Sequence, residues 1–127
     1  VVADVLNRIR GPFNVSAPAI VSGTAALDDH EFVARNRALN REERALVTEA
    51  LRGMGLEFTS SYGNFVLAGF PQKDGLTAQE IQDYLRAGGV LVREMGAYGL
   101  GEWLRISIGP PEANRRLIAM LAEKFVA

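Results

Sequence analysis

An arginine lies in the middle of the otherwise apolar segment 104–108 of this chain. Alternate residues of a strand share a face, so Arg105 points away from the face that the large aliphatic residues form. A guanidinium can hold a carboxylate through two parallel hydrogen bonds, which fix the position and the orientation of the bound acid. Arg105 is therefore a candidate substrate-binding residue. The alternative is a solvated arginine on the exposed face of a half-buried sheet.

A second arginine, Arg93, ends the apolar segment 90–93. If this segment and 104–108 are strands of one sheet, the two arginines can converge on a ligand with two anionic groups. The alternative is a surface charge or an ion-pair partner for Glu94. The glycine-rich loop 94–102 has neither the Lys-Ser/Thr pair nor the spacing of a nucleotide-binding loop, so it is not a phosphate-cradling motif.

Other polar residues offer a binding group but no catalyst. Asn64 stands immediately before the apolar segment 65–69, where its amide can bond a ligand or stabilise its own turn. The only histidine, His30, occupies a helix-start context beside two aspartates, and the chain has no cysteine, so we do not expect a protein-only zinc site. No Ser-His-Asp order and no general base is evident. From its residues alone, the chain is an anion-binding domain without a catalytic group.

Length and composition restrict the class of protein. The 127 residues, 48% hydrophobic and 23% charged, suit one soluble domain. A net charge of -1, with basic residues scattered among acidic ones, argues against a nucleic-acid partner. We expect no membrane partner, because no apolar run approaches the roughly 20 residues of a membrane span and no signal peptide is evident. The absence of cysteine fits a cytoplasmic location.

Hydrophobic periodicity and capping residues predict five helices and three strands. Ser16 can cap the second helix, and Thr77 with Glu80 matches a capping box at the start of the fourth. The predicted helices cover 1–10, 17–27, a long stretch from Asp28-Asp29 to Gly53, 77–87 and 110–125, and the strands cover 64–69, 90–93 and 104–108.

These elements predict an α+β two-layer sandwich, in which a small, mainly antiparallel sheet of three to four strands has helices packed on one face. Residues 11–16, rich in glycine, proline, asparagine and serine, are the candidate hinge. The amphipathic pattern is already under way at Val1, so we expect the sequence to be cut from a longer protein.

Four phrases, in this order and spacing, resemble the C-terminal third of the histidinol-phosphate aminotransferases. They are Arg10-Gly11-Pro12-Phe13-Asn14-Val15-Ser16, Asn64-Phe65-Val66-Leu67, Gly89-Val90-Leu91-Val92-Arg93 and Leu104-Arg105-Ile106-Ser107-Ile108-Gly109. Each phrase alone is weak, but four in sequence are a specific signal that spans almost the whole chain.

The resemblance implies a fold-type I pyridoxal-phosphate enzyme, whose small C-terminal domain closes over the substrate. Residues 1–16 would then be the connecting helix and hinge from a large cofactor-binding domain, and 17–127 the small domain. It implies that Arg105 binds the α-carboxylate of the amino-acid substrate, that Arg93 contacts the substrate phosphate, and that Asn64 belongs to a segment lining the substrate side. Histidinol phosphate has no carboxylate, so Arg105 would serve glutamate or 2-oxoglutarate, or both arginines the phosphate.

The expected parent is a homodimeric, cytoplasmic transaminase that transfers an amino group from glutamate to imidazole acetol phosphate in histidine biosynthesis, with pyridoxal 5'-phosphate as cofactor. The family's cofactor-binding lysine lies upstream of the matched stretch; neither Lys73 nor Lys124 is a replacement, so we expect the chain alone to be inactive. A threonine-phosphate decarboxylase or another aminotransferase of the group is an alternative. A free-standing, non-catalytic regulatory domain that binds anions is another.

Overall fold

The structure, a computed structural model, describes residues 2–11, 15–73 and 75–126. The chain divides into two compact units, Val1–Arg35 and Asn36–Ala127. Residues 12–14 of the predicted hinge lie outside the described residues. The division into a connecting segment 1–16 and a domain 17–127 stays a prediction.

The first unit consists of helices, and two of them start directly after the predicted capping residues. Its elements are α1 (Val2–Ile9), α2 (Ala17–Asp28) and the beginning of α3 (His30–Gly53). The Ser16 side chain accepts a hydrogen bond from the Ala19 amide at 3.4 Å, and the Asp29 carboxylate accepts one from the Phe32 amide at 2.9 Å. No described residue of α1 or α2 is buried, although both helices carry large apolar side chains.

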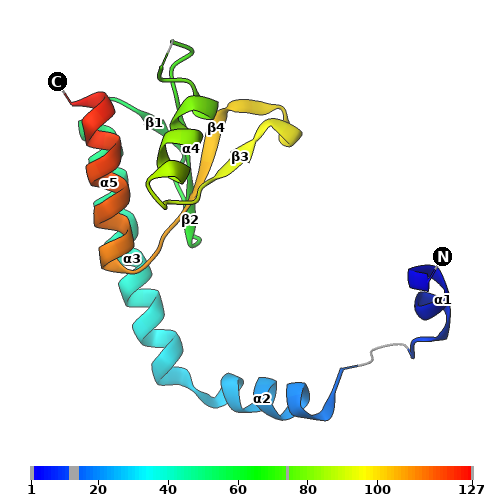
Figure 1. Ribbon diagram of the computed structural model, residues 1–127. Helices are drawn as coiled ribbons and strands as arrows, with labels where there is room; N and C mark the ends of the chain where they lie inside the picture. Colours follow the sequence, from blue (N-terminus) through cyan, green and yellow to red (C-terminus); the bar gives the residue numbers. More distant parts are fainter. Residues whose placement is uncertain (1, 12–14, 74, 127) are drawn as a thin grey trace. The chain divides into compact units, whose positions relative to one another are not determined.

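The second unit contains a four-stranded antiparallel sheet (Figure 1). Its strands are β1 (Glu57–Phe58), β2 (Phe65–Gly69), β3 (Arg93–Met95) and β4 (Leu100–Ser107), in the spatial order β1-β2-β4-β3. The predicted α+β fold class and the antiparallel pairing are confirmed. β4 is therefore an interior strand, bonded on both sides, whereas β3 forms an edge.

Three helices cover one face of this sheet: the C-terminal part of α3, α4 (Ala78–Ala87) and α5 (Pro111–Phe125). Alternate residues of β2 and β4 face them, as strand geometry requires. Burying each large aliphatic side chain contributes about 1.5–3 kcal/mol. The least exposed core residues are Val47, Leu51, Val66, Ala68, Ile81, Leu85, Leu104, Ile106 and Leu121.

The second predicted strand was placed too early. It was expected over 90–93, but β3 begins at Arg93. The backbone of residues 90–92 is instead hydrogen-bonded to α4. The Val90 amide donates to the Leu85 carbonyl at 2.8 Å, and the Gln82 side chain donates to the Val92 carbonyl at 3.3 Å. The hydrophobic run 90–92 has the pattern of a strand, but it forms the segment that leaves the C-terminus of α4.

The sequence pattern did not predict β1 or the early start of β4. β1 has only two residues, too few for an alternation to be recognised. β4 begins at Leu100, four residues before the predicted Leu104, because the glycine-rich loop forms a single 3-10 turn, η1 (Gly96–Tyr98), and then re-enters the sheet. Gly99 makes this possible, since its φ of 74° is one that glycine adopts without steric cost.

A buried asparagine fixes the turn that follows β4. Asn114 is 2% exposed, and its side-chain amide donates to the Gly109 carbonyl and to the Glu43 carboxylate, both at 2.8 Å. Its side-chain oxygen accepts from the Gly109 amide at 3.0 Å. One side chain therefore ties the end of the central strand to α5 and α3.

The capping box at α4 predicts an acid-dependent loss of stability. Hydrogen bonds from the Thr77 side chain and backbone, with a backbone hydrogen bond from Gly75, hold the pKa of Glu80 below its ordinary value of 4.5. A carboxyl whose pKa is lower in the folded chain stabilises it above the unfolded value, and this contribution is lost as the pH falls through the folded value. We expect wild type to exceed Glu80→Gln in stability at pH 7, and the difference to shrink below about pH 4.5.

Urea unfolding at a series of pH values measures this difference. Glu112→Gln, which also removes a carboxylate from the first turn of a helix, is the matched control. A difference between wild type and Glu80→Gln that stays constant from pH 7 to about pH 3 would contradict the role of the carboxylate.

Candidate anion-binding site

The two arginines singled out in the sequence face each other across a pair of strands. Arg93 of β3 is the direct partner of Arg105 of β4, and Leu67 of β2 completes the row. Directly opposed residues of an antiparallel pair project from the same face, and this face is the one opposite the helices. Like charges in such a position destabilise a sheet, whereas an anion held between them removes the repulsion.

The Arg105 guanidinium group lies over an aromatic ring. Its guanidinium carbon lies 5.2 Å from the centroid of the Phe65 ring, within the range of a cation–π interaction. Its Nε is buried and has no hydrogen-bond partner among the described residues. An unsatisfied buried donor costs about 1–3 kcal/mol, so an acceptor at this position, such as a carboxylate oxygen, would be favoured.

Arg93 is exposed and is oriented by a tyrosine. One of its terminal nitrogens donates to the Tyr98 hydroxyl at 3.3 Å, and its guanidinium carbon lies 5.8 Å from the ring centroid. Tyr98 reaches it because η1 brings the loop back beside β3. Sequence reasoning missed both aromatic neighbours, although Phe65 could have been found: it shares a strand face with Leu67, opposite Arg105.

Asn64 is not part of this pairing. It precedes β2, and its backbone carbonyl accepts a hydrogen bond from the Ile108 amide at 2.7 Å. It stands three residues before Leu67, about 10 Å away along an extended strand. Asn64 lies in the bend before the strand and is exposed, so the alternation of β2 does not set the direction of its side chain. The structure thus brings Arg93 and Arg105 together and leaves Asn64 at the end of the neighbouring strand.

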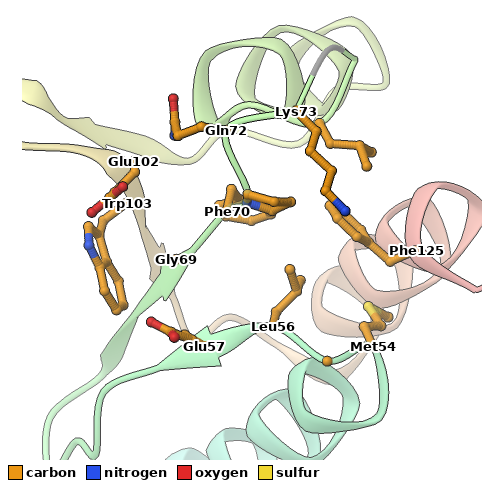
Figure 2. Close-up of a pocket in the computed structure, with 13 residues that line it drawn as sticks. Met54, Leu56, Glu57, Gly69, Phe70, Gln72, Lys73, Glu102, Trp103 and Phe125 are labelled. Atoms are coloured by element: carbon orange, nitrogen blue, oxygen red, sulfur yellow. The ribbon is translucent and has the colours of Figure 1, made fainter.

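A separate pocket of about 520 Å³ lies toward the other end of β2 and β4 (Figure 2). The Trp103 indole covers Gly69 there, so a Cβ at Gly69 would approach ring atoms at 3.2–3.3 Å. The Glu57 and Glu102 carboxylates lie on the Trp103 side of the pocket, and Lys73 extends toward Phe125. Neither arginine lines this pocket, and its mixed charges do not favour an anion.

Other classes of site are not supported within the described ranges. Residues 2–11, 15–73 and 75–126 contain no group of three or more His, Asp or Glu side chains placed to hold a metal ion. None of the helices in these ranges has the length and apolar character that crossing a membrane demands.

The sequence matches a known family along most of its length. The family model described as aminotransferase class I and II covers residues 1–121. Histidinol-phosphate aminotransferase of Maricaulis maris (strain MCS10) is 43% identical over 121 residues, which are 95% of this chain and 33% of the relative. That of Rhodospirillum centenum (strain ATCC 51521 / SW) is 50% identical over 110 residues, 87% of this chain and 30% of the relative. The chain spans about a third of the length of these curated relatives.

The fold of the chain also resembles that of solved aminotransferase structures. The crystal structure of histidinol-phosphate aminotransferase from Sinorhizobium meliloti in complex with pyridoxal-5'-phosphate superposes with a TM-score of 0.78 at 28% identity. The superposition covers 95% of this chain and 33% of that one.

The opposed arginines predict an unfavourable coupling. In a double-mutant cycle with Arg93→Gln and Arg105→Gln, we expect the pair to destabilise the chain by about 0.2–1 kcal/mol at low ionic strength. The coupling should fall in high salt, because the Debye length falls from about 30 Å at 0.01 M to 3 Å at 1 M. Thermal unfolding of the four proteins measures it, and a favourable or salt-independent coupling would show that the two guanidinium groups do not repel each other.

Proposed function

Because this chain belongs to the aminotransferase class I and II family, we propose that it is the substrate-binding C-terminal part of a pyridoxal-phosphate-dependent aminotransferase. The proposed reaction of the full-length parent is that of histidinol-phosphate transaminase, which exchanges an amino group between glutamate and imidazole acetol phosphate. The names of the Maricaulis and Rhodospirillum relatives favour this reaction over the phosphothreonine decarboxylation considered above.

The opposed pair Arg93 and Arg105 is the observation that carries this proposal. Both half-reactions of the proposed exchange use anionic substrates: glutamate and 2-oxoglutarate carry carboxylates, and the imidazole substrates carry a phosphate. Arg105, which lies over the Phe65 ring, binds the carboxylate through its planar fork. Arg93, held by Tyr98, contacts the phosphate. Asn64, in the bend before β2, offers a further polar contact on the substrate side, outside the arginine pair.

The cofactor is proposed for the parent, since the Sinorhizobium relative is described in complex with pyridoxal-5'-phosphate. When bound, the cofactor supplies the electron sink that amino-group transfer requires. The described residues do not fit it. Lys124 Nζ lies 4.6 Å from the Tyr84 ring centroid, and Lys73 lines a pocket whose other charged side chains are both carboxylates, unsuited to a cofactor phosphate. We assign cofactor binding to the part of the relatives that this chain does not match.

Substitution of the carboxylate-binding arginine in the full-length parent tests the proposal. A charge-assisted hydrogen bond contributes about 1.5–3 kcal/mol, so Arg105→Gln should lower kcat/KM for glutamate by about tenfold to a hundredfold. Arg105→Lys should restore only part of it, because lysine keeps the charge but lacks the fork. Arg86→Gln, which removes an exposed arginine paired with Asp83, is the control. Steady-state kinetics with glutamate that are unchanged by Arg105→Gln would refute the assignment.

A second experiment tests the assignment of the cofactor site to the unmatched part. Added to the Val1–Ala127 chain, pyridoxal phosphate should give no saturating one-to-one absorbance band. The weak reaction of exposed lysines is measured by the loss of signal in the Lys73→Gln/Lys124→Gln variant. A stoichiometric band that depends on one of these lysines would place a cofactor site within this chain.

A further inference from the structure

A second group of arginines lines a pocket on α3, away from β3 and β4. This pocket, called the α3 pocket below, has a volume of about 220 Å³. It is lined by Arg37, Asn40, Arg41, Arg44 and Tyr62. The four α3 residues lie at intervals of three and four, so one face of the helix carries all of them. The fifth comes from the loop between β1 and β2.

Along α3, no carboxylate is spaced to pair with the arginines of this cluster. The positions three and four residues away from Arg37, Arg41 and Arg44 along α3 hold no aspartate or glutamate. Three other helical arginines are paired at such spacings: Arg35 with Glu31, Arg52 with Glu49 and Arg86 with Asp83. Like charges one helical turn apart are destabilising, so the cluster concentrates unbalanced positive charge at the mouth of a pocket.

The base of the α3 pocket is fixed by hydrogen bonds. Arg44 and Asn40 both donate to the Gly63 carbonyl, at 2.8 Å and 3.1 Å. The Ser61 hydroxyl donates to the Phe65 carbonyl and accepts from the Gly63 amide, so the loop beside Tyr62 is held in one conformation. Gly63 engages one of the five N–H donors of the Arg44 guanidinium. The remaining donors, with those of exposed Arg37 and Arg41, surround a preorganised concave surface.

We propose that the α3 pocket binds the phosphate group of a small phosphorylated molecule. Several guanidinium groups around one cavity match a phosphate, which offers three or more strong acceptor oxygens to planar donor forks. The Tyr62 side chain, 97% exposed at the rim, provides an apolar ring face for the organic part of the ligand. This site is distinct from the one formed by Arg93 and Arg105, because the two share no residue and lie on different elements.

Phosphate titration of the Val1–Ala127 chain, followed by backbone amide NMR at constant ionic strength, tests the proposal. We expect saturable shifts at residues 37–44 and 61–63 with inorganic phosphate. Arg41→Gln should weaken this response about tenfold or more, as loss of a charge-assisted contact requires. Phenyl phosphate should bind more tightly than inorganic phosphate, and Tyr62→Ala should remove only that advantage.

Three variants separate this site from its alternatives. Arg52→Gln, a matched exposed arginine on the same helix, and Arg105→Gln should both leave the shifts at 37–44 unchanged. Arg37→Gln provides a second loss-of-binding variant, and since Arg37 and Arg41 are both exposed, neither change disturbs the core. The proposal is overturned if these residues show no saturable shift up to about 10 mM phosphate. It is equally overturned if shifts appear only around 93 and 105, or if Arg52→Gln weakens binding as much as Arg41→Gln.

Discussion

The pairing of β3 with β4 is the constraint on which the proposed substrate site depends, because it sets two positive side chains opposite each other on one face. Neither residue has this position by local structure alone. The turn at Gly99 sets where β4 begins, and the Asn114 hydrogen bonds fix the loop in which it ends. The positions of the two arginines on this face therefore depend on contacts made elsewhere in the chain.

One face of the sheet packs on the helices and the other does not, which explains how an arginine can occupy the middle of a sheet. On the helix side, Leu104 and Ile106 anchor the strand in the apolar core. Arg105, between them in sequence, projects from the other side and can be polar without disturbing that core. Stability and the proposed ligand binding thus depend on alternate residues of one strand, and substitutions on one face need not affect the other.

Much of this arrangement could be predicted from the sequence. The capping residues Ser16 and Thr77 marked helix starts correctly, and the alternation around Arg105 gave the correct faces. The register between the arginines could not be predicted. It depends on the 3-10 turn η1 and on the segment 90–92, which follows α4 although it has the pattern of a strand. Tyr98 was missed for the same reason: only the folded loop brings it to Arg93.

β4 has hydrogen-bonded neighbours on both sides, whereas β3 is a three-residue edge strand with an irregular register after Glu94. Arg105 therefore has a fixed position in the sheet, and Arg93 is held by a segment with fewer restraints. A site built from one fixed and one adjustable cation tolerates anions of different length, since the span between the charges can adapt while one end stays in register. The proposed transaminase would receive two unlike substrates in turn and would need this tolerance.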